Sequence, residues 1–149
     1  MNQKASPLNG LLRYRSALER AAWFKLQGAN AELARALELL QQLEREKVQL
    51  GRDRMEKLAT GLSGAELMLE CSSAIEHAIT RATNSLAQSR LNSHAAQDEF
   101  RCCRREREVV ENAIARQETR QQQKAERREQ GRQDDATLRR ISRQKQPSN

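Results

Sequence analysis

The sequence has few of the residues that build sheets, disulfide frameworks and breaks in a chain. Among 149 residues there are two prolines, three cysteines and four aromatic side chains. So few aromatic and β-branched residues leave little from which to form a sheet. An odd number of cysteines without framework spacing does not predict a disulfide-stapled secreted domain. Because no apolar run is long enough for a signal peptide or a membrane-spanning helix, we expect a reduced, cytoplasmic protein.

The residues that usually fill a globular core are also scarce. Leu, Ile, Val and Phe supply 27 of the 149 residues, which is below the roughly 20% at which a packed core becomes doubtful. Ala, Glu, Lys, Leu and Arg supply 81 residues, and a share near half is typical of coiled coils and long helices. The composition therefore predicts an all-α protein without a globular core.

A short stretch before mid-chain has the signals of a turn between two helices. Gly61 can adopt the left-handed conformation that ends a helix after Thr60. Ser63 and Glu66 fit a capping box, in which each side chain satisfies a backbone donor at the start of the next helix. A short turn between long helices makes them antiparallel neighbours. The residues assigned to this structural turn are Gly61, Ser63, Gly64 and Glu66.

Before the turn, apolar residues follow a seven-residue repeat that predicts a helix-packing seam. Its members are Leu26, Ala29, Leu33, Ala36, Leu40 and Leu43. A second series follows at Val48, Met55 and Leu62, with Leu58 between the last two. The eight-residue step from Leu40 to Val48 predicts a shift of register near Lys47.

After the turn the repeat is longer and more regular, although many of its side chains are small. It comprises Met68, Ser72, Ile75, Ile79, Ala82, Leu86, Ser89, Ser93, Ala96, Phe100, Cys103, Arg107, Val110 and Ile114. We expect a long two-helix antiparallel coiled-coil hairpin. Its predicted parts are a frayed N-terminus over 1–6, a helix over 7–60, a turn over 61–63, a helix over 64–130 and a disordered, flexible basic tail over 131–149 that begins at the helix-breaking Gly131.

The net charge of +7 is concentrated toward the two ends of the chain. A hairpin that turns at Gly61 brings the two basic regions together. Such a field attracts acidic protein surfaces, nucleic acid or anionic lipid, and does not choose among them. We favour docking to an acidic protein, with nucleic-acid binding as the alternative. The candidate partner-binding arginines are Arg13, Arg15, Arg20, Arg101, Arg104, Arg105, Arg127 and Arg128.

Trp23 and Phe24 are adjacent, so both cannot lie in a narrow seam. Either one of them packs on the second helix, or one is exposed as an anchor for a partner. We add both residues to the candidate partner-binding set.

No residue pattern indicates an enzyme, and we expect no catalytic residue, metal or cofactor. His94, Cys102 and Cys103 share one stretch of helix, but adjacent cysteines point about 100° apart and no paired spacing anchors a metal. A cysteine–histidine nucleophile pair would need a pocket that excludes water, which a two-helix rod does not provide.

The two seams, the break at Gly61 and the small-residue series Ile75, Ile79, Ala82 and Leu86 resemble the FliJ-type stalk proteins of type III export, from flagellar and virulence secretion systems. The resemblance covers residues from about 8 to 130. It implies a non-enzymatic central stalk, similar to the rotor subunit of rotary ATPases, that binds and activates a hexameric secretion ATPase. It also implies links to an export-gate membrane protein and to secretion chaperones.

By the same resemblance, we expect a cytoplasmic monomer that lies at the inner membrane only through the secretion apparatus. The alternatives are a basic coiled coil that binds nucleic acid and a scaffold protein. The positive terminal end is expected to enter the ATPase ring, which leaves the turn free for another partner.

Overall fold

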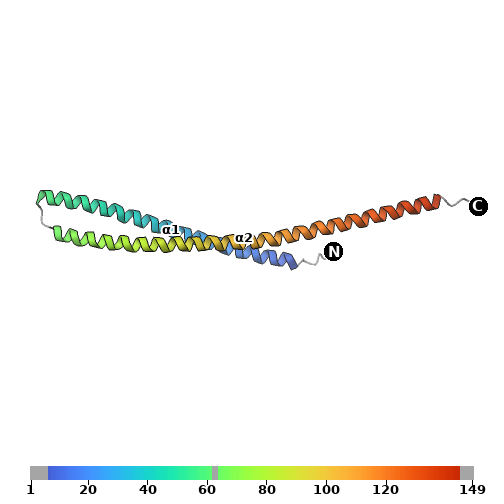
Figure 1. Ribbon diagram of the computed structural model, residues 1–149, viewed down its shortest axis with the longest axis horizontal. Helices are drawn as coiled ribbons and strands as arrows, with labels where there is room; N and C mark the ends of the chain where they lie inside the picture. Colours follow the sequence, from blue (N-terminus) through green and yellow to red (C-terminus); the bar gives the residue numbers. More distant parts are fainter. Residues whose placement is uncertain (1–6, 62–63, 145–149) are drawn as a thin grey trace, which may run out of the picture. The chain divides into compact units, whose positions relative to one another are not determined.

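The computed structural model describes residues 7–61 and 64–144, which form two helices (Figure 1). Helix α1 spans Pro7–Thr60 and helix α2 spans Ala65–Gln144, and no strand occurs in these residues. The two predicted long helices are therefore confirmed. The expected frayed N-terminus, the Ser63 cap and the last five residues lie outside the described part of the chain. Neither helix contains a stretch that is long and apolar enough to span a membrane, as far as the described residues go.

The turn between α1 and α2 depends on two glycines. Gly61 has a φ of 67° and Gly64 a φ of 128°, both in the range that disfavours side chains. The N–H of Gly61 donates to the carbonyl of Leu58 at 3.4 Å, and the N–H of Met68 donates to the carbonyl of Gly64 at 3.1 Å. The prediction that Gly61 ends the first helix is confirmed, and the second helix begins one residue after Gly64.

Substitution of Gly61 by Ala is expected to lower the free energy of unfolding by about 1–2 kcal/mol. A Cβ at Gly61 would meet no atom within 4 Å, so the cost comes from the left-handed backbone alone. Gly51 is the matched control, because it lies inside α1 and a Cβ there also meets open space. Gly51→Ala should raise stability by up to about 1 kcal/mol. Urea unfolding followed by circular dichroism measures both, and effects of the same sign would contradict this account of the turn.

Contacts divide the chain into two units, which we describe separately. The hairpin unit comprises residues 17–104, and the terminal unit comprises residues 1–16 and 105–149. In the hairpin unit the helices are antiparallel, because contacts further along α1 reach residues further back on α2 (Figure 1). The pairs are Lys25 with Glu99 at 2.8 Å, Ser93 with Asn30 at 2.7 Å and Lys47 with Glu76 at 3.5 Å.

The seam predicted for the second helix is confirmed at every position. In the hairpin unit, Met68, Ala82 and Leu86 of α2 are buried, as is Ala22 of α1. In the terminal unit, Val110 is buried. The remaining predicted members of the α2 series are half-buried, and these include Arg107. Small seam residues make this core thin, so it depends on a few larger side chains.

The predicted shift of register near Lys47 is wrong. Val48 and Met55 are 56% and 70% exposed, whereas Leu50 and Arg54 are half-buried. The original spacing therefore continues from Leu43 through position 47 to Leu50 and Arg54. Long basic side chains can occupy such positions because their aliphatic stems cover apolar surface while their charges stay in water. A continuous register also keeps α1 beside α2 without local rewinding.

The predicted end of the second helix also differs from the structure. Helix α2 continues through Gly131 to Gln144, where a flexible tail was expected to start at residue 131. An interior glycine costs only about 1 kcal/mol relative to alanine. Strong helix formers flank it on both sides, and Arg132 lies 3.9 Å from Glu129 across it. The sequence has no proline in this region before Pro147.

Candidate partner-binding site

In the terminal unit, an ion pair joins the start of α1 to α2. Arg15 donates to Glu106, and the two side chains are 32% and 43% exposed. Arg107 pairs with Glu111 one turn further along α2. The role of Glu106 as the partner of Arg15 was not predicted from the sequence. The spacing of Leu8, Leu12 and Arg15 could have indicated this pairing. It extends the α1 seam back to the first turn of α1 and places the charge of Arg15 within that seam.

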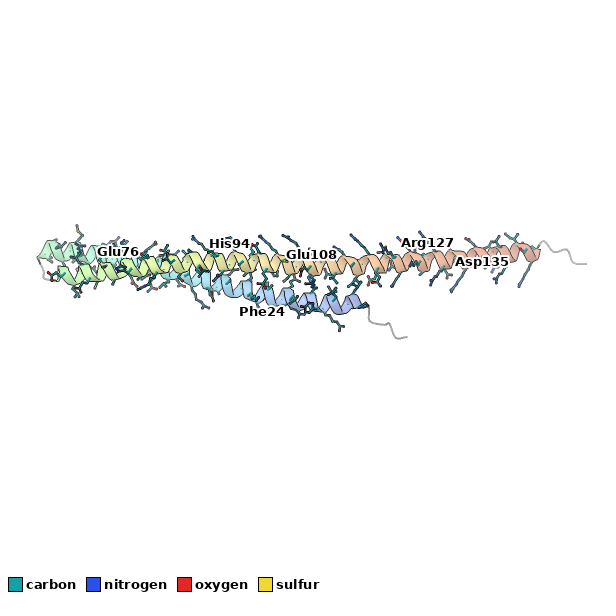
Figure 2. The ribbon with its side chains drawn as sticks, turned by 60° about the horizontal axis from the view of Figure 1, so that its bottom comes forward. Phe24, Glu76, His94, Glu108, Arg127 and Asp135 are labelled. Atoms are coloured by element: carbon teal, nitrogen blue, oxygen red, sulfur yellow. The ribbon has the colours of Figure 1, made fainter. Side chains whose placement is uncertain are left out.

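The same unit contains a stretch of α2 that is exposed on all sides. Every residue from 115 to 144 is exposed, and the stretch carries nine basic and five acidic side chains. Figure 2 shows Arg127 and Asp135 on this part of α2. Of the candidate arginines, Arg13, Arg105, Arg127 and Arg128 are exposed in the terminal unit, and Arg15 is half-buried in its ion pair.

The charge divides unequally between the two units. Residues 1–16 and 105–149 contain fifteen basic and eight acidic side chains, a net charge of +7. Residues 17–104 contain twelve of each sign and are neutral. The whole net charge of the protein therefore lies in the terminal unit, which is a sharper polarity than the gradient along the sequence had indicated.

Trp23 and Phe24 form an exposed aromatic pair in the hairpin unit. Their ring centroids lie 5.1 Å apart in an edge-on arrangement. Trp23 is 44% exposed and Phe24 is 67% exposed, and Figure 2 shows where Phe24 projects from α1. Neither ring is buried against α2, so the more exposed Phe24 fits the anchor alternative better than the packing alternative.

The candidate arginines of the hairpin unit are Arg20, Arg101 and Arg104, and all three are exposed. Arg101 lies 3.7 Å from Asp98 on the same helix. The structure thus divides the candidate set between the two units, five residues in each. The turn residues Gly61, Gly64 and Glu66 are exposed, whereas Ser63 lies outside the described residues.

Lys25 of α1 forms an ion pair with Glu99 of α2 in the hairpin unit. The hydrogen bond that it donates to Glu99, together with the charge of that carboxylate, raises the pKa of Lys25 above its ordinary value. A raised lysine pKa stabilises the fold below the ordinary value, and the stabilisation is lost as pH rises through the raised pKa. The pair is therefore formed throughout the neutral range, although solvent screening keeps its contribution small.

Among the residues that the structure describes, metal-ligating side chains do not converge on a site. Within residues 7–61 and 64–144, no three His, Cys, Asp or Glu side chains are placed to hold one ion. Cys71 and Cys102 are exposed, and Cys103 is half-buried in the seam.

Comparison with known proteins places these features in a family. The family model described as the flagellar FliJ protein matches residues 3–146, which is nearly the whole chain. No curated protein matches the sequence significantly, and no solved structure does so either.

Proposed function

Because the chain belongs to the flagellar FliJ protein family, we propose that it is a non-enzymatic central stalk that binds and activates the hexameric ATPase of its export apparatus. Membership of the family makes it a component of flagellar protein export. The finer role is our inference from the fold, the charge distribution and the resemblance in the sequence.

The observation that carries the proposal is the charge of the terminal unit. All of the net charge of +7 lies there, and residues 115–144 of α2 expose side chains in every direction. A basic helix that is accessible all round suits insertion into a ring whose lining is acidic. Exposed charges also steer association, so binding of the ring should weaken as salt screens the field.

Two features of the hairpin unit suit the other contacts of a stalk. Its net charge is zero, so it would add little to electrostatic capture by the ring. The exposed rings of Trp23 and Phe24 offer an apolar anchor of the kind that dominates protein interfaces. We propose that this unit contacts the export-gate membrane protein or secretion chaperones, and that the protein works as a cytoplasmic monomer held at the inner membrane by these partners.

Reversal of two charges on α2 should weaken stimulation of the ATPase. With Arg127→Glu and Arg128→Glu combined, about tenfold more protein should be needed for half-maximal phosphate release by the cognate ATPase, because the steering field is reduced. Arg81→Glu with Arg90→Glu is the matched control, since it makes the same charge change in exposed residues of the hairpin unit. Equal effects of the two variants, or stimulation that does not depend on salt, would contradict the proposed role of the terminal unit.

Nucleic-acid binding remains the alternative prediction, and it rests on the same arginines. It predicts salt-dependent binding of single-stranded DNA or RNA that Arg127→Glu and Arg128→Glu abolish. A scaffold role predicts neither nucleic-acid binding nor ATPase stimulation. Family membership favours export over both.

A further inference from the structure

An apolar stripe runs along the outer surface of α1 near the turn. It consists of Val48, Gly51, Met55 and Leu58, which we call the outer stripe. Val48, Met55 and Leu58 are 56%, 70% and 54% exposed, and a Cβ at Gly51 would meet no atom within 4 Å. Val48, Met55 and Leu58 were expected to lie in or beside the hairpin's own seam, and the structure leaves all three exposed.

The spacing of the outer stripe indicates what kind of element it can pack against. Its residues are separated by three, four and three positions, which is the alternation of one face of a packed helix. A β-strand or an irregular segment would not match an alternation of three and four positions. Val48, Met55 and Leu58 are large side chains that are each more than half exposed, and a row of exposed apolar side chains marks an interaction site, unlike single apolar residues scattered over a surface.

Basic side chains border the outer stripe on both edges. With the α1 seam at heptad positions a and d, the stripe occupies b and e. Arg45 and Arg52 then lie at f on one edge, and Lys47 and Arg54 lie at a on the other. Lys47 is paired with Glu76 at 3.5 Å. No carboxylate of the described residues forms an ion pair with Arg45, Arg52 or Arg54.

The acidic side chains of this surface do not cancel that charge. Glu44 precedes the stripe, in the groove that it lines together with Arg45, Val48 and Arg52. Glu56 lies beyond Arg52 at position c. The two positions that flank a helix interface, which decide which partner is accepted, are basic on both sides.

From this juxtaposition we infer that the outer stripe binds an amphipathic helix of another protein, with apolar residues in heptad spacing and carboxylates on both flanks. Aspartate or glutamate on each edge would meet the unpaired arginines while the apolar residues cover Val48, Met55 and Leu58. A second copy of this chain is the wrong occupant, because it would bring the same basic edges together. The inference does not rest on the proposed ATPase contact, which uses the terminal unit.

Two designed peptides test the inference on the full-length chain. Each has three heptads with Leu at positions a and d; one carries Glu and the other carries Lys at positions e and g. Measured by fluorescence anisotropy, the Glu peptide should bind in the micromolar range and the Lys peptide at least tenfold more weakly. Val48→Gln with Met55→Gln should weaken the Glu peptide at least tenfold, and glutamine is a good helix former, so α1 should be retained.

Matched variants distinguish specific binding at the outer stripe from nonspecific binding to exposed apolar residues elsewhere. Leu91→Gln removes another exposed leucine, 64% exposed, and should leave the affinity unchanged. Arg45→Glu with Arg52→Glu reverses the charge of one edge and leaves Lys47 and Arg54 basic on the other, so it should remove most of the difference in affinity between the two peptides. The inference is overturned if the Glu peptide does not bind, if both peptides bind equally, or if Leu91→Gln weakens binding as much as the stripe variant. Dimerisation of the peptide-free chain that Val48→Gln with Met55→Gln abolishes would also overturn it, because the occupant would then be a second copy.

Discussion

Deletion of residues 61–64 is expected to convert the chain of 17.1 kDa, which we propose to be a monomer, into a dimer. The two glycines with positive φ are lost, and Thr60 is then followed by Ala65, so that α1 and α2 can continue as one helix. Each seam loses its intramolecular partner and has to be buried by a second chain. Sedimentation equilibrium at micromolar concentration should give about twice the monomer mass.

The deletion should be effective because four residues restore the heptad phase. The α1 seam ends at Leu50 and Arg54, and the α2 seam begins at Met68 and Ser72. Removal of four residues places Met68 fourteen positions after Leu50, which is two full heptads. The joined helix therefore has one continuous apolar face from α1 into α2, as a two-chain coiled coil requires.

Replacement of the same four residues by alanines is the matched control. It also removes the turn, but it retains four additional residues that throw the two seams out of phase and locally unwind the coiled coil. The replaced chain should dimerise more weakly than the deleted chain. If the deleted chain remained a monomer with unchanged hydrodynamic radius, the turn would not be what enforces the hairpin.

Leu86→Ala should be the most destabilising of the conservative seam substitutions. Leu86 is only 5% exposed, and its seam neighbours along α2 are Ala82 and Ser89, which are too small to fill the space that it leaves. Removal of a buried leucine side chain costs about 2–4 kcal/mol when the surroundings do not collapse. That is a large part of the 5–15 kcal/mol typical of a folded protein, and urea unfolding by circular dichroism measures it.

Leu91→Ala is the control for that loss. Leu91 lies five residues further along α2 and is 64% exposed, so its truncation should change the free energy of unfolding by no more than about 0.5 kcal/mol. Similar effects at Leu86 and Leu91 would mean that α2 is not held by burial of its seam.

The sequence was sufficient for the parts of the fold that local chemistry determines. The positive φ of Gly61 was predictable because glycine, which has no Cβ, adopts the left-handed backbone conformation without a steric cost. The α2 seam could be predicted over six heptads because apolar and small residues recur there at every position except Arg107. Both features depend on residues within a few positions of one another.

The sequence did not show which of two faces of α1 packs against α2. Between Lys47 and Leu58, α1 carries two candidate seams, and the more apolar one is the one left exposed. The choice is made by the register already fixed at Leu40 and Leu43, together with α2 beside them, and not by local hydrophobicity. The sequence likewise indicates Arg15 as a partner-binding residue, whereas in the structure Arg15 forms an ion pair with Glu106 of α2.

The candidate site was predictable in composition but not in arrangement. The sequence indicated which arginines and aromatic residues stand out from a chain of this kind. It did not indicate that the terminal unit holds the whole net charge while the hairpin unit is neutral, because that division follows from which segments contact one another.

Site-specific photo-crosslinking to the cognate hexameric ATPase tests the central claim most directly. A photoreactive amino acid would replace Arg127 in the terminal unit or Lys57 near the end of α1, both of them exposed. The stalk account predicts crosslinks from position 127 to residues that line the central pore, and none there from position 57. Pore crosslinks from position 57, with none from position 127, would show that the turn end enters the ring and would contradict the account.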